Sequence, residues 1–219
     1  MADSGTTTPD PDRYRSQHDL LDDLVLGPGR SASLSALQRY FADGPLRESY
    51  TGRHFERFEG GGDALDVRDR VTSADVLALN FLSITDLAGV AVDTTVTHVA
   101  KIADLLQDIK TDTAMHEAEW STYAESSPAY ELWALFKRCG GKNRWVTANK
   151  LLARKRPHLI PVYDSRVQAL LGAPERFWAC LWTWFHTDDE RRTDSLRELR
   201  STVGEIEDIS LLRCLDVAL

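Results

Sequence analysis

Eight basic side chains within residues 132–163 form the group whose type and spacing most directly suggest chemistry. This stretch contains no Asp or Glu, although the whole chain has 26 basic and 34 acidic residues and a formal net charge of −8. The other residues therefore carry 26 − 8 = 18 basic against 34 acidic side chains. A local cationic surface on an acidic protein is typical of a site for a polyanion such as a nucleic acid. The eight residues are Lys137, Arg138, Lys142, Arg144, Lys150, Arg154, Lys155 and Arg156.

Asp164, in the run PVYDSRV, is the first acid after this basic stretch. A carboxylate next to a polyanion site is a candidate for catalysis. Asp is also one of the residues favoured at the N-cap of a helix, and the pattern predicts that a helix begins here and ends at Gly172. The sequence leaves both roles open.

Two further helices are expected to carry the basic residues. Ser127 and Pro128 provide an N-cap and a first-turn proline for a helix that Gly140 and Gly141 stop. The next helix should run from about Trp145 to Lys155, before an extended connection that contains Pro157 and Pro161. The basic stretch is therefore predicted to form a helix, a glycine-bearing turn and a second helix, within a region of about 127–172.

Helical periodicity also dominates the rest of the chain. Thr72 and Asp75 have the spacing of a capping box, and they open a helix whose inner face is expected to contain Val76, Leu77 and Phe81. Three other helices are predicted from apolar positions spaced three and four apart. Their inner residues are Leu34, Leu37, Tyr40 and Phe41; Val96, Val99, Ile102, Leu105, Leu106 and Ile109; and Phe177, Trp178, Leu181, Trp182 and Phe185.

Two segments lack this pattern. Residues 46–64 contain aromatic residues without helical spacing and three consecutive glycines, so we expect an irregular segment or a small β-hairpin. Residues 1–15 are expected to be a disordered tail, because the chain begins with polar residues, prolines and aspartates. The prediction is a mainly α protein with one helical domain over residues 16–219.

Composition also sets expectations about location and cofactors. No apolar run reaches the length of a membrane span, and a signal peptide is not expected. Cys139, Cys180 and Cys214 are an odd, scattered set that favours a reduced, cytoplasmic protein. The six histidines show no metal-binding spacing, so neither a metal nor another cofactor is predicted. Cations near Cys139 would lower the pKa of its thiol, although a small residue at a helix end is the alternative.

VTANKLL followed by PVYDSRV resembles the helix-hairpin-helix DNA glycosylase superfamily. In that superfamily a hairpin is followed by a helix with a TA(N/D) step and then by a PVDTHV-like segment. Ala148 precedes Asp164 by 164 − 148 = 16 residues, and the superfamily landmarks have about the same separation. The resemblance implies a glycosylase-like helical bundle and places Asp164 on the catalytic aspartate. The longer run ARKRPHLIPVYDS also resembles a bacterial family of domains of unknown function.

The hairpin departs from the superfamily pattern. Counted back from the TAN step, its two glycines would be Lys142 and Arg144. With one inserted residue they become Gly141 and Asn143, and Asn tolerates the left-handed conformation that such glycines adopt. Only this second register keeps the backbone amides that bind a DNA phosphate. Val146 stands where lyase members carry lysine, so the resemblance implies a monofunctional enzyme.

The chemistry that the resemblance implies is cleavage of an N-glycosidic bond. The Asp164 carboxylate would stabilise positive charge on the sugar and direct a water molecule. The target base must leave the stack, and an aromatic pocket formed by Trp145 and Tyr163 would receive it. Packing of these two rings against neighbouring helices is the structural alternative. The expected DNA-binding residues are Gly141, Lys142, Asn143, Arg144, Lys150, Arg154, Lys155 and Arg166.

The leading hypothesis is therefore a DNA-binding helix-hairpin-helix protein, extended in its strongest form to base excision at Asp164. The first alternative is a DNA-binding module without catalysis, in which Asp164 only caps a helix. The second is a protein-interaction domain whose acidic surface meets a protein partner. No membrane partner is expected.

Overall fold

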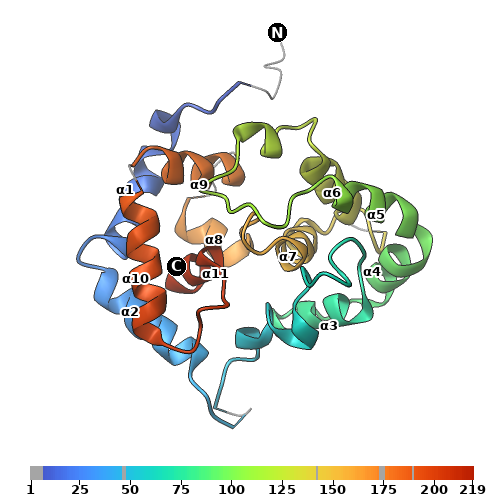
Figure 1. The fold of residues 1–219 in the computed structure, drawn as a ribbon, viewed down its shortest axis with the longest axis horizontal. Helices are drawn as coiled ribbons and strands as arrows, with labels where there is room; N and C mark the ends of the chain where they lie inside the picture. Colours follow the sequence, from blue (N-terminus) through green and yellow to red (C-terminus); the bar gives the residue numbers. More distant parts are fainter. Residues whose placement is uncertain (1–6, 46–47, 142, 173–175, 189) are drawn as a thin grey trace.

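The chain is all-helical in the ranges that the structure, a computed structural model, describes: residues 7–45, 48–141, 143–172, 176–188 and 190–219 (Figure 1). These ranges contain no β-strand. The α-helices are α1 (Arg15–Val25), α2 (Arg30–Phe41), α3 (Ser73–Phe81), α4 (Ala88–Val92), α5 (Val99–Gln107), α6 (Pro128–Phe136), α7 (Trp145–Lys155), α8 (Ser165–Leu170), α9 (Phe177–His186), α10 (Arg191–Val203) and α11 (Leu211–Ala218). Short 3-10 segments are η1 (Pro11–Tyr14), η2 (Thr51–His54), η3 (Phe58–Gly60) and η5 (Trp120–Tyr123), and η4 (Asp93–Thr97) is a π-helical turn.

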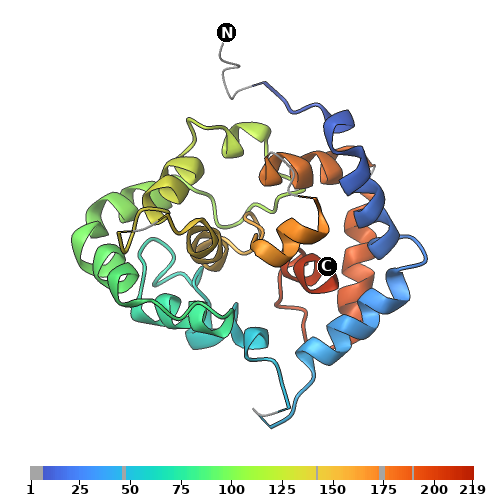
Figure 2. The ribbon, with the colours of Figure 1, turned by 180° about the vertical axis from the view of Figure 1, so that it is seen from behind.

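The helices form two groups that lie on either side of the molecule (Figures 1 and 2). Helices α1, α2, α10 and α11 pack together, so the beginning and the end of the chain share one group. The second group contains α3, α4, α5 and α6, and α7 contacts both α3 and α6. Segment η5 contacts α6 and α9, and α9 contacts α1, so η5 and α9 together link the two groups.

Local sequence signals position the helices around the predicted basic region. Ser127 caps α6 by accepting from the amide of Tyr130, and α7 has the predicted bounds Trp145–Lys155. Thr72 and Asp75 form the complete capping box at the start of α3. Each cap supplies partners for helix-end amides that the helix itself leaves unpaired.

Three side chains that the sequence placed on the buried faces of helices are exposed: Leu77, Val96 and Val99. Val96 and Val99 are exposed, because the π turn η4 and the break at His98 end the stripe that the spacing predicted, whereas Ile102 and the later residues are buried. Leu77 is also exposed, at 49%. Helix α3 buries Val76, Ala78 and Leu79 instead, and neighbouring positions on a helix differ by about 100° in direction.

The sequence predicted either an irregular segment or a small β-hairpin over residues 46–64, and the described part of this segment is irregular. Residues 48–64 contain the turns η2 and η3, and the hairpin alternative is wrong for these described residues. Gly60 and Gly61 adopt positive φ angles of 80° and 96°. Gly62 is required for close packing, because a β-carbon there would collide with the backbone carbonyl of Arg154.

Part of the predicted disordered tail is ordered. Residues 11–15, which the sequence placed in the tail, form η1 and the start of α1. Asp10 caps η1 through the amide of Asp12, and Tyr14 is buried in the core. One aromatic side chain among the polar residues is enough to anchor this part of the chain.

Three buried cations at the C-terminal end of α7 and just after it bind backbone carbonyls of other segments, and two of them, Arg154 and Lys155, hold the irregular segment 46–64. Arg154 donates to the carbonyls of Phe55 and Phe58, and Lys155 donates to the carbonyls of Gly62 and Val67. Arg156, just after the helix, donates to the carbonyls of Leu106, Ile109 and Arg68. Buried carbonyls outside regular structure need donors, and these three side chains supply them.

Asp75 balances two of these cations. One carboxylate oxygen lies 3.1 Å from Arg154 Nε, and the other lies 3.1 Å from Lys155 Nζ. The second oxygen also accepts from the amide and hydroxyl of Thr72. A single carboxylate therefore completes the α3 capping box and compensates the charge at the end of α7.

We predict that Asp75→Asn lowers the free energy of unfolding by about 3–5 kcal/mol, because two buried cations lose their charge partner. Urea denaturation followed by circular dichroism measures this loss. Glu131→Gln, which breaks the exposed pair between Lys101 and Glu131, is the control and should change the same quantity by about 0–1 kcal/mol. Equal effects of the two substitutions would contradict the role given to Asp75.

Candidate functional site

Three of the predicted DNA-binding cations are buried inside the protein. Lys150, Arg154 and Lys155 are only 5%, 1% and 0% exposed. Lys150 Nζ donates to the carbonyl of Leu82 at 2.9 Å and lies 3.0 Å from Asp164 Oδ2. The prediction that these three side chains hold DNA phosphates is therefore wrong, because internal acceptors use their donors.

The remaining basic residues near the turn between α6 and α7 differ in accessibility. Arg138 and Arg166 are exposed and Lys137 is partly exposed. Arg144 is mostly covered and pairs with the carboxylate of Asp86 at 2.6 Å. Lys142 lies outside the described residues. About half of the basic residues in this stretch are therefore buried and bind internal acceptors, so they are not available at the surface.

The turn itself does not use the hairpin register that the resemblance required. Gly140 and Gly141 have positive φ angles of 76° and 72°, whereas Asn143 does not adopt the left-handed conformation. The amide of Gly140 donates to Asp93 Oδ2 at 2.8 Å, so an internal carboxylate takes the place of a phosphate. The amide of Arg144 closes the turn on the carbonyl of Lys137 at 2.9 Å. Gly141 and Asn143 are both exposed on this turn.

Asp164 caps helix α8. Its Oδ1 accepts from the amides of Arg166 and Val167 at 2.9 and 3.2 Å, and its Oδ2 is bound by Lys150. The side chain is 21% exposed. Burial alone would raise the pKa of Asp164, but the Lys150 ammonium and the two amides outweigh it and hold the pKa below its usual value. Of the two roles left open by the sequence, the structure contains the cap.

A cavity of about 600 Å³ lies between α6 and α7 on one side and η5, α8 and α9 on the other. Trp145 and Tyr163, the predicted base pocket, both line it, and their ring centroids are 5.3 Å apart. Tyr163 also stacks on Phe177, with centroids 4.0 Å apart and planes 13° from parallel. Eight aromatic residues line the cavity: Trp120, Tyr123, Tyr130, Trp133, Trp145, Tyr163, Phe177 and Trp178.

Most of this aromatic wall was not predicted from the sequence. The sequence assigned Phe177 and Trp178 to the core by their helical spacing, and both do pack against it while also lining the cavity. Tyr130 and Trp133 are three residues apart on α6, so their shared face was a readable signal. Trp120 lies in a 3-10 turn that no sequence pattern indicated.

A few charged and amide side chains line the cavity together with these aromatic rings. Lys137 Nζ lies 4.8 Å from the centroid of the Trp133 ring. Arg176 pairs with Glu125 at 3.4 Å, and both side chains are substantially exposed. The remaining polar lining consists of three amides, those of Asn143, Asn149 and Gln168. The cavity therefore has two cations against one carboxylate.

Two indole N–H groups in the wall, those of Trp120 and Trp133, are buried and have no acceptor among the described residues. An unpaired buried donor costs about 1–3 kcal/mol. Asn149, in contrast, donates to the carbonyl of Trp145 at 2.8 Å. A ligand that changed the positions of these side chains and offered hydrogen-bond acceptors would pair the two indole N–H groups.

Other candidate chemistry is weak in the described ranges. Burial raises the pKa of Cys139 to about 11, so the alternative of a lowered thiol pKa is wrong. No group of three or more His, Cys, Asp or Glu side chains has metal-binding geometry in the part of the chain that the structure describes. None of the described helices combines the length and apolar character needed to cross a membrane.

Comparison with known proteins gives one match. A family model described as DUF6308, a family of unknown function, matches residues 33–219. The search of curated proteins and the search of solved structures each found nothing similar. The resemblance to helix-hairpin-helix glycosylases has no support from these matches.

We predict that Asp164→Asn keeps the cap but leaves Lys150 unpaired, and lowers the free energy of unfolding at pH 7 by about 1–3 kcal/mol. The folded pKa of Asp164 is depressed, so its contribution is present above the unfolded value of about 3.9 and is lost as the pH falls through the folded value. Urea denaturation between about pH 2 and 7 should therefore show a flatter acid limb in the variant. Asp164→Ala should cost about 1 kcal/mol more, since it also removes the cap. An acid limb that is unchanged in Asp164→Asn would contradict the ion pair.

Proposed function

The chain belongs to DUF6308, and since the function of that family is unknown, we propose from the cavity that the protein binds DNA and receives one unstacked base between its aromatic rings. The observation that carries the proposal is the wall of eight aromatic residues around a cavity of about 600 Å³. Cavities of about 300–1,000 Å³ are usual for ligand sites. Stacking on an aromatic side chain contributes about 1–3 kcal/mol per base.

The charge of the cavity favours an anionic ligand. An aromatic cage for a cation would need free ring faces and an acidic surround, whereas Lys137 already lies over Trp133 and Glu125 is already paired with Arg176. A nucleotide combines a planar base with a phosphate, and Lys137 and Arg176 suit that phosphate. Arg138, just after α6, and Arg166, on α8, are two further exposed cations that can contact phosphates.

The amides of the lining supply both donors and acceptors to a base edge. Asn and Gln side chains pair with the edges of adenine and other bases through such groups. Asn149 is held in place by its bond to the carbonyl of Trp145, while Asn143 is exposed on the turn and Gln168 lies on α8. The base that these amides select is left to experiment.

Binding without base excision fits the position of Asp164. A glycosylase needs a carboxylate directed at the sugar, in order to stabilise the charge that develops there. Both oxygens of Asp164 are engaged, and this residue is not among those that line the cavity. The proposed function is therefore that of a DNA-binding module.

We predict that the full chain binds a single-stranded oligonucleotide, or a duplex with one bulged base, more tightly than a fully paired duplex. Trp145→Ala should weaken binding of the unpaired base about tenfold or more, the equivalent of one lost stacking contact. Tyr50→Ala, which removes an exposed aromatic residue outside the cavity, is the matched control and should leave affinity unchanged. Fluorescence anisotropy of labelled oligonucleotides measures each affinity.

The salt dependence of binding and the size of the ligand distinguish DNA from a free mononucleotide as the ligand. Affinity for DNA should fall as salt rises, and Lys137→Ala should reduce the slope while Lys101→Ala, an exposed lysine on α5, should not. Absence of any oligonucleotide binding at low salt would overturn the proposal, and binding of a free mononucleotide alone would overturn the DNA part of it. Release of a base that Asp164→Asn abolishes would overturn the non-catalytic part.

A further inference from the structure

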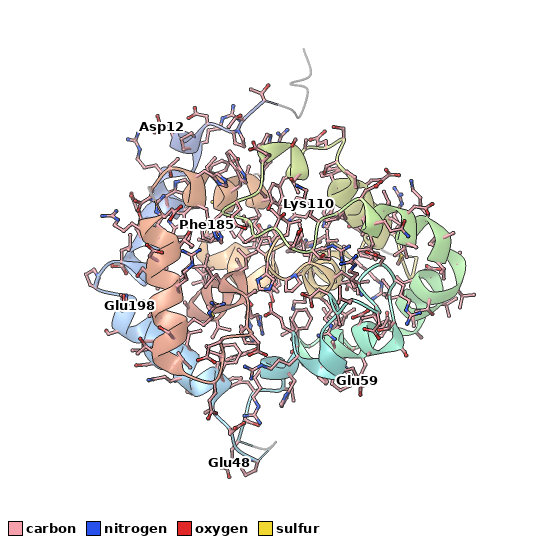
Figure 3. The ribbon with its side chains drawn as sticks, viewed as in Figure 1. Asp12, Glu48, Glu59, Lys110, Phe185 and Glu198 are labelled. Atoms are coloured by element: carbon pink, nitrogen blue, oxygen red, sulfur yellow. The ribbon has the colours of Figure 1, made fainter. Side chains whose placement is uncertain are left out.

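A second, smaller hollow of about 230 Å³ lies where residues 114–117 meet α10 and α11. Phe185, labelled in Figure 3, forms part of its wall. Four nitrogen-bearing side chains line it: His116, His158, Arg197 and Arg200. None of them belongs to the aromatic cavity.

Backbone pairing sets the two histidines next to each other. The amide of Met115 donates to the carbonyl of His158 at 2.9 Å, so the segments before η5 and after α7 run side by side at this point. Arg197 and Arg200 are three residues apart on α10 and therefore share one face of that helix. The four side chains thus come from three separate parts of the chain.

A hydrogen bond joins two of these side chains. His116 Nε2 lies 3.3 Å from Arg197 Nη2. A guanidinium only donates, so Nε2 must accept and the His116 ring must be neutral in this state. Burial lowers the pKa of His116, and Arg197 and His186 lower it further, while Glu117 and Glu190 act in the opposite direction.

Two acids lie close to the group, and neither uses all of the donors that it offers. Glu117 is the one carboxylate among the lining residues, and it lies 3.8 Å from His116 Nε2 while also accepting from the amide of Ala114. Asp194 binds Arg197 Nη1 on the same helix, one turn before it. Arg200 Nη1 donates to the carbonyl of Ile209 at 2.8 Å. Each guanidinium has five N–H donors, so each keeps donors beyond these bonds.

We propose that this hollow binds a compact oxyanion of the phosphate or sulfate class, held by Arg197 and His116, with Arg200 adding to the positive field and His158 forming part of the wall. Arginine binds phosphate through two parallel hydrogen bonds, and a protonated histidine donates a third. An anion oxygen placed between His116 and Arg197 replaces their hydrogen bond with two charge-assisted bonds once the His116 ring is protonated. Binding of the anion is accompanied by uptake of a proton at His116.

The inference does not depend on the aromatic cavity. Isothermal titration of the full chain with inorganic sulfate, whose charge does not change in this range, at constant ionic strength made up with chloride, should show saturable binding that strengthens as the pH falls from about 7.5 to 5.5. Arg197→Ala should weaken it about tenfold or more. Arg191→Ala is the matched control, because Arg191 is an exposed arginine on the same helix with the same pairing to an acid three residues earlier, and it should leave binding unchanged.

Three further variants make the outcome decisive. His116→Gln should weaken binding and remove its pH dependence, Arg197→Lys should retain part of the affinity, and Trp145→Ala should have no effect. A phosphomonoester such as glycerol phosphate distinguishes a site for the free ion from one for a phosphate group on a larger ligand. No saturable binding of either probe, or an equal loss in Arg191→Ala and Arg197→Ala, would overturn the proposal.

Discussion

The buried charge cluster at the end of α7 is the interaction on which the rest of the structure depends. Arg154 and Lys155 donate to carbonyls of residues 55–67, and Arg156 donates to the carbonyls of Arg68, Leu106 and Ile109. Asp75 supplies the compensating charge at 3.1 Å from Arg154 and Lys155. Without these donors the carbonyls would be buried and unpaired. The cluster also holds α7 against α3, and α7 provides Trp145 to the aromatic cavity. Stability and the geometry of the candidate site are linked through one helix.

The same cluster explains why charge alone misled the sequence-based prediction of DNA contacts. An uncompensated run of basic residues is usually a solvated or ligand-binding surface, because burying a charge is costly. Here the partners of Arg154 and Lys155 are backbone carbonyls and a carboxylate about 80 residues earlier in the chain (154 − 75 = 79). Every residue has a backbone carbonyl, so the sequence does not show which carbonyls will accept hydrogen bonds from these cations. Lys137, Arg138, Arg166 and Arg176 remain exposed or partly exposed, and the proposed contacts with a polyanion are limited to these four side chains.

Local signals predicted the helices well, and long-range packing decided the rest. The all-helical class, the Thr72 and Asp75 capping box, the Ser127 cap and the bounds of α7 follow from short-range chemistry. Trp145 and Tyr163 were predicted as a pair and do line one cavity. The other six aromatic residues lie on η5, α6 and α9. Whether they line the same cavity depends on how these elements pack together, which the local sequence does not specify. The π turn η4, which exposes Val96, has no sequence signature of its own.

We propose recognition of a base rather than its removal, because eight aromatic residues line the cavity and Asp164 caps α8 without lining that cavity. The most direct test places 2-aminopurine, a fluorescent base, at a single unpaired position of an oligonucleotide and follows its emission as the protein is added. Stacking between Tyr163, Trp145 and their neighbours predicts strong quenching in the wild-type complex and much less in Trp145→Ala. An emission that stays constant or rises while the wild-type protein binds the strand would show that the base remains outside the cavity, and would contradict the account.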